Sequence, residues 1–205
     1  MEIYVLDLCA LRPRMEAALA ILTSERRERA LRLRHQEARL RSVGAGLLLR
    51  HFFGEKSVSR TPRGKPYIDG ESPFSLSHSG DLAVLAVSSC PVGVDVETIA
   101  PVRDGMPRRV LTEEEQLWLE AHPEDGFFRL WTRKEAALKC LGGGIDRALR
   151  SFSVLPGERL TLDGRTLDLY TVPYKGAVIS TAAEGESAEF IPRELDVDQL
   201  LAKET

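Results

Sequence analysis

The sequence has few cysteines and no cysteine pattern. Among its 205 residues only Cys9, Cys90 and Cys140 are cysteines, and no two of them form a Cys-x-x-Cys pair. An odd, scattered set of this kind argues against a disulfide framework. We therefore expect free thiols in a reducing compartment, and hence a cytoplasmic protein.

Long apolar runs and a strong charge imbalance are also missing. The longest apolar run lies around Leu82–Val87, whereas a membrane-spanning helix needs about 20 residues. The first residues lack the basic region and cleavage site of a signal peptide. The formal net charge is −3, which gives no general attraction to nucleic acid or to an anionic membrane. We expect neither partner.

The length and composition fit one large domain, or two small ones with a shared core. Apolar residues make up 43% of the chain, which is ordinary for a globular protein. Charge is unevenly distributed, since Arg12–Arg50 is rich in arginine and Asp104–Asp125 is rich in acids. This asymmetry indicates an anionic ligand on the N-terminal half.

Local patterns predict a mixed succession of helices and strands. Thr112 and Glu115 form a capping box that marks one helix start. Gly44 and Gly46 lie inside a helix, so we expect a backbone or a ligand to approach there. The expected helices are Arg14–Leu22, Glu25–Leu33, Gln36–Phe53, about 112–121 and Asp125–Leu141. The expected strands are Glu2–Leu8, Tyr67–Ile68, Phe74–Ser77, Leu82–Ser88, Pro91–Glu97, Phe152–Leu155, Thr166–Val172, Ala177–Ala182 and Phe190–Pro192.

Two short segments recur at an offset of about 90 positions. Leu22–Glu25 resembles Leu111–Glu114, and Arg39–Ser42 resembles Arg129–Thr132. Each copy consists of a capped helix, a longer helix and then strands. This spacing suggests two copies of one α+β unit, although chance similarity is the alternative.

The strand Pro91–Glu97 alternates valines with acids, so Asp95 and Glu97 share one side and lie about 7 Å apart. Two such carboxylates repel unless a cation lies between them, and Mg²⁺ prefers carboxylate oxygens. A solvated edge strand is the simpler alternative. On the helix after Asp125, Trp131, Glu135 and Lys139 form one stripe. If this helix crosses the strand, Glu135 becomes a third carboxylate; otherwise it forms an ordinary surface pair with Lys139.

Four segments together resemble the signatures of the 4′-phosphopantetheinyl transferases. The first pair is Gly93–Glu97 and, about forty residues later, Trp131–Lys139. The second pair is Gly64–Tyr67 and Phe74–Gly80, and the helices from Thr23 to Arg41 resemble the longer, Sfp-type members. The resemblance covers Leu22 to about Leu141.

The resemblance implies a pseudo-dimer of two similar α+β halves with the active site in the cleft between them. We expect residues 1–103 to form the coenzyme A-binding half and residues 104–205 the half that completes the metal site and docks the carrier protein. The implied reaction moves the phosphopantetheine arm of coenzyme A onto a serine of an acyl or peptidyl carrier protein. It depends on Mg²⁺ and releases adenosine 3′,5′-bisphosphate. We expect a monomer.

The resemblance also implies residue roles. Asp95, Glu97 and Glu135 are the implied Mg²⁺ ligands, and the implied catalytic residues are Asp95, Glu135 and Lys139. Glu135 or a metal-bound water accepts the serine proton, and Lys139 faces the pyrophosphate. We expect Lys134 to be a peripheral phosphate contact at most. The implied coenzyme A contacts are Arg26, Arg29, Arg41, Ser42, Lys65, Ser77, His78 and Lys139.

Two other functions remain open from the sequence. A protein that binds coenzyme A or a carrier without catalysis would have no need of all three carboxylates and Lys139. A different Mg²⁺-dependent phosphoryl or nucleotidyl transferase is the third possibility, and the missing P-loop pattern weakens it. Carrier proteins are acidic around their serine, so we expect Arg103, Arg108 and Arg109 to contact the carrier.

Overall fold

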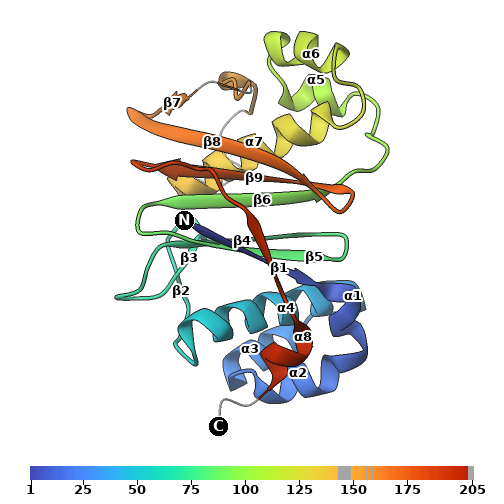
Figure 1. Ribbon diagram of the computed structural model, residues 1–205, viewed down its shortest axis with the longest axis vertical. Coiled ribbons are helices and arrows are strands. Elements are labelled where there is room, and N and C mark those ends of the chain that lie inside the picture. The colour runs from blue at the N-terminus through green and yellow to red at the C-terminus, as the bar shows by residue number, and fades with distance from the viewer. Residues whose placement is uncertain (143–148, 156, 158, 203–205) are drawn as a thin grey trace.

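The computed structural model describes residues 1–142, 149–155, 157 and 159–202. Two four-stranded sheets lie at its centre, and helices pack on the outer side of each (Figure 1). The fold is therefore mixed α+β, as the sequence patterns predict.

The first sheet has the strand order β10-β1-β5-β4. Strand β1 pairs antiparallel with β5 and parallel with β10. Tyr4, Leu6 and Leu85 point to one side and pack on the long helix α4. The strands of this sheet are β1 (Glu2–Asp7), β4 (Phe74–Ser79), β5 (Leu82–Val87) and β10 (Pro192–Leu195). The helices on this side are α1 (Leu8–Leu11), η1 (Arg12–Arg14), α2 (Met15–Ile21), α3 (Ser24–Leu31), α4 (Gln36–Phe53) and α8 (Val197–Leu201).

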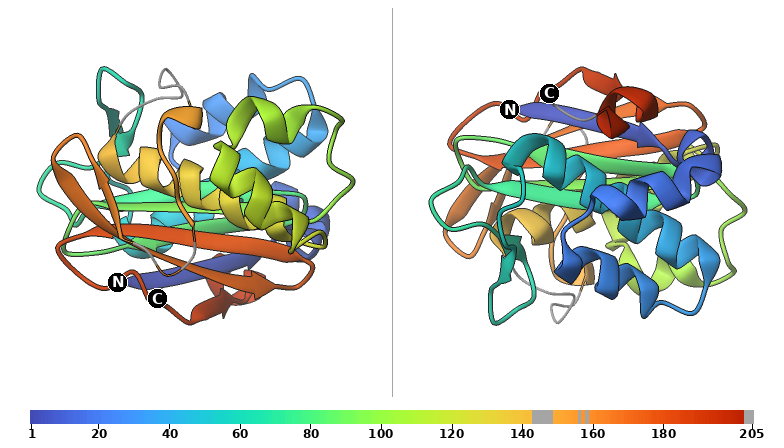
Figure 2. Two further views of the ribbon diagram at one scale, coloured as in Figure 1. Left: turned by 90° about the horizontal axis from the view of Figure 1, so that it is seen from above. Right: turned by 90° about the horizontal axis from the view of Figure 1, so that it is seen from below.

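The second sheet is antiparallel throughout, with the order β6-β9-β8-β7. Helix α7 covers one face of this sheet, whereas α4 covers the first sheet (Figure 2). Its strands are β6 (Val92–Thr98), β7 (Leu160–Leu162), β8 (Arg165–Tyr174) and β9 (Ala177–Glu184). The helices are α5 (Met106–Val110), α6 (Glu113–Glu120), α7 (Gly126–Leu141) and η2 (Leu149–Ser151), and a separate hairpin joins β2 (Ser59–Arg60) to β3 (Pro66–Tyr67).

A third apolar cluster joins the two sheets. Residues of β1 and β5, such as Val5 and Val84, pack there against Val94 of β6 and Ile179 of β9. Val92, Val94 and Val96 are all fully buried in this cluster. The valine side of β6 therefore forms the joint between the sheets, which leaves its acidic side free to face α7 and β4. The alternation predicted for this strand is confirmed.

Gly93 sets the distance between β6 and α7. A Cβ atom built on Gly93 would lie 1.9 Å from the Ala136 carbonyl oxygen and 2.5 Å from the Cys140 nitrogen, so a side chain cannot fit there. Gly44 and Gly46 of α4 meet side chains instead: a Cβ would lie 2.5 Å from Leu8 Cδ2 at Gly44 and 3.0 Å from Leu22 Cδ2 at Gly46. The close approach of another backbone that we expected at Gly44 and Gly46 is therefore not seen there. It is found instead at Gly93 of β6.

The observed elements differ from the predicted ones mainly in the second half. The strand predicted at Phe152–Leu155 is wrong, because the carbonyls of this segment accept hydrogen bonds from side chains of α7 rather than from a neighbouring strand. The strand predicted at Phe190–Pro192 begins only at Pro192. The sequence patterns do not predict the short elements α1, η1, β2, α5, η2, β7 and α8. Helix α4 has the predicted bounds, and the Thr112–Glu115 capping box is present.

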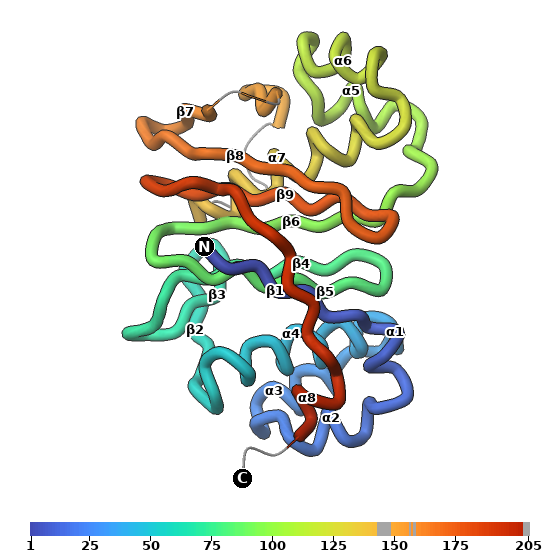
Figure 3. Tube along the Cα trace, viewed as in Figure 1, coloured from blue at the N-terminus to red at the C-terminus, as the bar shows by residue number. Residues whose placement is uncertain are grey.

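The chain does not divide between the sheets at one point. Strand β6 belongs to the second sheet, although it precedes residue 103. At the other end, β10 returns to pair with β1, and α8 lies against α2 (Figure 3). The division at residue 103 stays a prediction. Among the described residues, no helix combines the length and the apolar character that crossing a bilayer requires.

Candidate active site

Strand β6 presents two carboxylates on its acidic side. Asp95 is 4% exposed and Glu97 is half-buried. Asp95 Oδ1 accepts hydrogen bonds from Ser77 Oγ at 2.7 Å and from Lys139 Nζ at 2.6 Å. Glu97 Oε2 accepts one from Ser79 Oγ at 2.5 Å, and Trp131 Nε1 lies 3.4 Å from Oε1. Strand β4 and helix α7 therefore orient both acids.

Alternate serines of β4 connect it to β6. Ser75 Oγ accepts from the Val94 backbone nitrogen at 3.1 Å, and Ser79 Oγ accepts from the Thr98 nitrogen at 3.2 Å. Ser77 uses its hydroxyl for Asp95 instead. A spacing of two places all three serines on one side of the strand, so the row links the edges of the two sheets. The sequence analysis gave Ser75 and Ser79 no role, although their alternation was the available signal.

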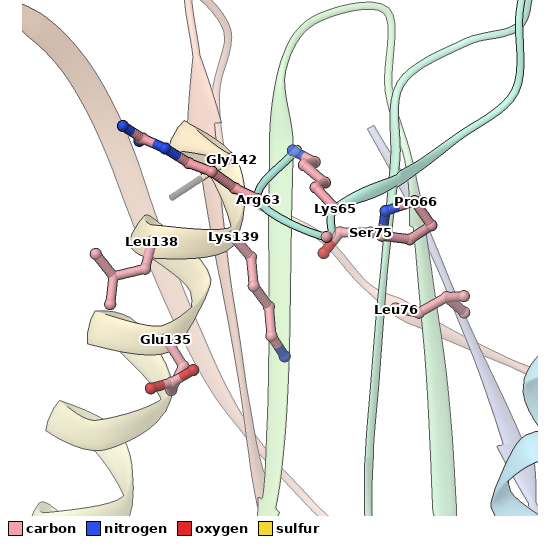
Figure 4. A pocket seen from close by; sticks show the side chains of 10 residues that line it. Arg63, Lys65, Pro66, Ser75, Leu76, Glu135, Leu138, Lys139 and Gly142 are labelled. Carbon is pink, nitrogen blue, oxygen red and sulfur yellow. The ribbon is translucent and has the colours of Figure 1, made fainter. Parts of the chain in front are cut away.

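Helix α7 carries Glu135 and Lys139, and both interact with the acids of β6 (Figure 4). Lys139 Nζ donates to the Val94 carbonyl at 3.1 Å as well as to Asp95. Glu135 is 9% exposed. Burial raises the pKa of its carboxyl, and the charges of Asp95 and Glu97 raise it further, while Lys139 lowers it. Three acids and one ammonium group thus interact across β6 and α7, as the sequence analysis required.

Asp95 and Glu97 line a cavity of about 610 Å³, whereas Glu135 lines a smaller cavity beside it. Lys139, Ser77 and His78 line the larger cavity together with residues of α3, α4 and β2. His78 reaches solvent, and its pKa is lowered by partial burial and by the positive charges of Arg41 and Lys139. Seven of the predicted coenzyme A contacts line this cavity: Arg26, Arg29, Arg41, Ser42, Ser77, His78 and Lys139.

Lys65, the remaining predicted coenzyme A contact, does not line the larger cavity. It lines a smaller adjoining cavity of about 260 Å³ together with Glu135 and Leu138, and Lys139 borders both cavities (Figure 4). Its ammonium group donates to the Val92 carbonyl at 3.0 Å and to the Cys140 carbonyl at 3.3 Å. Lys65 therefore connects the β2–β3 hairpin to both β6 and α7.

The acids fit a hard cation by their chemistry. Asp95 Oδ2 and Glu135 Oε1 are buried and have no hydrogen-bond partner among the described residues. Unpartnered buried oxygens of this kind are costly, and carboxylate oxygens are the ligands that Mg²⁺ takes. In the described part of the chain, no group of three or more acidic, histidine or cysteine side chains is arranged so that it could hold a metal ion.

Lys134 does not line either cavity, which is consistent with the expectation that it is a peripheral phosphate contact at most. Its side chain is fully buried and pairs with the buried Glu115 at 2.9 Å. Its Nζ also donates to the Leu149 carbonyl at 2.8 Å and the Phe152 carbonyl at 2.5 Å. Lys134 follows Arg133 on the far side of α7 from the cavity, where the helix packs on the 149–155 segment.

A family model described as the 4′-phosphopantetheinyl transferase superfamily matches residues 91–181, which include β6 and α7. A 4′-phosphopantetheinyl transferase of Bacillus subtilis is 34% identical over 161 residues, covering 71% of this chain and 70% of that protein. The chain belongs to the 4′-phosphopantetheinyl transferase superfamily. The resemblance inferred from the four motifs is confirmed.

Other 4′-phosphopantetheinyl transferases are also similar to this chain. The Sfp protein of Bacillus subtilis strain 168 is 31% identical over 164 residues, covering 73% of this chain and 71% of that protein. AcpT of Salmonella typhimurium is 39% identical over 104 residues, with 46% and 54% covered. Among solved structures, the holo-[acyl-carrier-protein] synthase of Thermotoga maritima aligns with a TM-score of 0.36 at 17% identity, covering 46% of this chain and 62% of that one. Family membership rests on the sequence relatives.

Proposed function

We propose that this transferase moves the 4′-phosphopantetheine arm of coenzyme A onto a serine of an acyl or peptidyl carrier protein, with Mg²⁺, and releases adenosine 3′,5′-bisphosphate. Family membership supports the phosphopantetheinyl transfer. One observation supports this site: Asp95 and Glu97 of β6 and Lys139 of α7 line an arginine-lined cavity, and Glu135 of α7 interacts electrostatically with all three from the adjoining smaller cavity.

The charged residues of the cavity suggest where the pyrophosphate and the nucleotide of coenzyme A would bind. Asp95, Glu97 and Glu135 would hold Mg²⁺, which supplies charge neutralisation on the pyrophosphate when it is bound. Lys139 and His78 lie beside these acids and can donate to the same phosphate oxygens. Arg41 and Ser42 of α4 line the cavity and would hold the nucleotide. Because the reactive phosphorus carries negative charge, such fixed donors lower the barrier by stabilising its oxygens.

Glu135 is the proposed acceptor of the serine proton. The raised pKa of its carboxyl and its Oε1, which has no hydrogen-bond partner among the described residues, fit a group that accepts a proton more readily than an ordinary glutamate. The adjoining smaller cavity contains Glu135 and gives an incoming serine a place beside it. A water held by the metal is the alternative base.

We further propose a pseudo-dimer of two α+β halves, residues 1–103 and 104–205, in a monomeric chain with the active site between the halves. Each sheet carries one long helix, α4 or α7, and the site draws residues from both. The carrier would dock on the exposed basic residues Arg103, Arg108 and Arg109 near α5. The cytoplasmic location stays a prediction from the free cysteines.

The test is a mass measurement on a carrier protein. The purified protein is incubated with coenzyme A, MgCl₂ and an apo carrier from the same organism, and the carrier is weighed for the added arm. We expect the mass gain, and we expect Asp95→Asn and Glu135→Gln to slow it by at least about 100-fold, as the loss of one transition-state contact does. Glu120→Gln on the exposed face of α6 is the matched control and should keep the full rate.

The competing binding function predicts a different result. A protein that only holds coenzyme A or the carrier would bind coenzyme A but leave the mass of every apo carrier unchanged. Transfer that proceeds at the normal rate in both acid variants would also contradict this site, since catalysis would then lie elsewhere in the chain.

A further inference from the structure

Two lysines bond to the same edge of β6. Lys139 of α7 donates to the Val94 carbonyl at 3.1 Å. Lys65, from the β2–β3 hairpin, donates to the Val92 carbonyl at 3.0 Å. Carbonyls two residues apart point the same way from a strand, so the two ammonium groups lie one after the other along β6 (Figure 4). Lys139 also pairs with Asp95, which makes its place on the strand part of the active site.

Lys65 also holds the residue that follows Lys139. Its Nζ donates to the Cys140 carbonyl at 3.3 Å. The stem of the lysine lies against the end of α7 as well, since a Cβ atom on Gly142 would be 3.7 Å from Lys65 Cδ. Burial lowers the pKa of Lys65, so this position costs free energy, which carbonyls at the negative end of the helix dipole offset. Lys65 therefore binds strand and helix at the point where Lys139 joins them.

The end of α7 needs such donors, because the last four carbonyls of a helix have no partner within it. In α7 these carbonyls are those of Leu138, Lys139, Cys140 and Leu141. The Gly142 nitrogen donates to the first two. Lys65 donates to the third, and Nη1 of Arg165 on β8 lies 3.5 Å from the fourth. Two cations thus cap the turn that carries Lys139. Arg165 belongs to the sheet that α7 covers, whereas Lys65 reaches α7 from a separate hairpin.

The hairpin that carries Lys65 is closed at its tip and lines both cavities. The Thr61 nitrogen donates to the Lys65 carbonyl at 2.9 Å, and the Lys65 nitrogen donates to Thr61 Oγ1 at 3.1 Å. Nη1 of Arg60 donates to the Gly64 carbonyl across the same turn at 2.7 Å. Pro66, the residue after Lys65, lines both the larger and the smaller cavity. A ligand that contacts Pro66 in either cavity therefore lies beside the residue that holds α7.

We propose that Lys65 is a positioning residue that couples the β2–β3 hairpin to α7 and so holds Lys139 against Asp95. It acts through Lys139 rather than on the reacting atoms. Its ammonium group is engaged with carbonyls of β6 and α7 instead of coenzyme A, the contact that the sequence predicts. Because misplacing a catalytic group by about 1 Å costs about 100-fold in rate, the anchoring of this turn bears directly on Lys139. The kinetic part of the inference rests on the proposed function.

The first test measures kcat and the KM for coenzyme A with an apo carrier protein. We expect Lys65→Met to lower kcat by about 10-fold or more and to change the KM by less than about threefold, because misplacing Lys139 affects the transition state more than substrate binding. Lys65→Arg should recover most of the rate, since a guanidinium group can donate to both carbonyls. Arg165→Gln is the matched control. It removes the other cation at the same helix end, outside both cavities, and should keep kcat within about twofold.

The second test does not depend on catalysis. Hydrogen-exchange mass spectrometry follows the peptide that contains the last turn of α7, with and without coenzyme A. In the wild type and in Arg165→Gln we expect coenzyme A to slow exchange in this peptide, because it binds against the hairpin that Lys65 links to the helix. In Lys65→Met exchange without ligand should be about 10-fold faster, as the loss of a hydrogen bond from a charged group predicts, and coenzyme A should no longer slow it.

The proposal fails if Lys65→Met weakens coenzyme A binding in calorimetry while kcat and exchange in α7 stay unchanged, since the side chain would then contact the substrate. It also fails if Arg165→Gln loses as much as Lys65→Met, since any cap of the helix would then suffice. If Lys65→Met does not fold, Lys65→Gln takes its place with the same expected losses, because its shorter side chain cannot span both carbonyls. A wild type that binds coenzyme A but modifies no carrier overturns the proposed function, and the exchange measurement still decides the role of Lys65. A wild type that does not bind coenzyme A overturns both.

Discussion

At the scale of single residues, the main feature of this site is two buried carboxylate oxygens that have no hydrogen-bond partner among the described residues. One oxygen of Asp95 accepts hydrogen bonds from Lys139 and Ser77, whereas its other oxygen and one oxygen of Glu135 have no partner in the part of the chain that the structure describes. Proteins rarely leave such atoms unsatisfied, because each costs about 1–3 kcal/mol. Both oxygens belong to carboxylates that share one region, so a cation can satisfy them together.

The first prediction concerns Glu135→Gln in buffer without divalent cations. The raised pKa means that the ionised carboxyl destabilises the fold above that pKa. At pH 7.5 the variant should therefore melt about 2–4 °C above the wild type, the shift that about 1 kcal/mol gives in a domain of this size. The difference should vanish below pH 4.5, the ordinary value for glutamate, where the carboxyl is protonated in both the folded and unfolded chain.

The second prediction is that Mg²⁺ stabilises the wild type more than it stabilises Glu135→Gln. Scanning fluorimetry with coenzyme A and increasing MgCl₂ should raise the melting temperature of the wild type more than that of Glu135→Gln, because a ligand stabilises the state that binds it. A variant that gains as much as the wild type from MgCl₂ would show that Glu135 does not contribute to cation binding.

At the scale of elements, the contact between β6 and α7 decides whether the site exists. The helix crosses the strand at Gly93, where a Cβ would collide with two backbone atoms of α7. Lys65 and Lys139 hold this junction with hydrogen bonds, and Ser77 links β4 to Asp95 of β6. The three acids, Lys139 and His78 lie on these two elements or on β4, so a small shift of α7 would move Glu135 and Lys139 together.

Gly93→Ala tests this contact. Because the methyl group would meet backbone rather than a mobile side chain, α7 must move away from β6. We expect a loss of about 1–3 kcal/mol in stability, typical of overpacking, and a fall in kcat greater than the rise in the KM for coenzyme A. Gly46→Ala is the control: Leu22 can move aside there, and alanine favours the helix by about 1 kcal/mol. Equal behaviour of the two variants would argue against the role of Gly93.

A buried ion pair fixes the other side of the same helix. Lys134 and Glu115 are both fully buried, and Glu115 Oε1 also accepts from the Val154 nitrogen at 2.9 Å. Lys134→Met would leave the charge of Glu115 without its partner, so we expect a loss of about 3–5 kcal/mol in unfolding free energy measured with urea. Lys175→Met breaks an exposed pair with Glu194 and should cost less than about 1 kcal/mol. Similar losses in both would contradict the prediction.

At the scale of the whole molecule, the C-terminal segment ties the two sheets together. After β9 the chain leaves the second sheet, adds β10 to the edge of β1, and places Val197 and Leu200 in the core of the first half. The two halves therefore share more than the valine cluster, and the last elements stabilise the half that contains the arginine-lined cavity.

A chain that ends at Ile191 tests this link. It would expose the edge of β1 and the apolar surface under α8, so we expect a melting temperature at least 5 °C lower and aggregates in size-exclusion chromatography. Asp198→Ala removes only an exposed pair with Arg14 and should behave as the full-length protein does. A truncated chain with unchanged stability would show that the halves are held by the valine cluster alone.

The sequence by itself determined the chemistry of this protein. Period-two alternation placed Asp95 and Glu97 on one side of a strand, a capping box located α6, and the order of four motifs identified the family, because each depends only on neighbours in the chain. Tertiary structure alone decided which cations face the cavity. Lys65 lies on a loop near β6 and pairs with carbonyls, Lys134 turns into the core, and Arg60 enters the cavity from β2. A local pattern cannot give these outcomes, because they depend on how elements distant in sequence pack together.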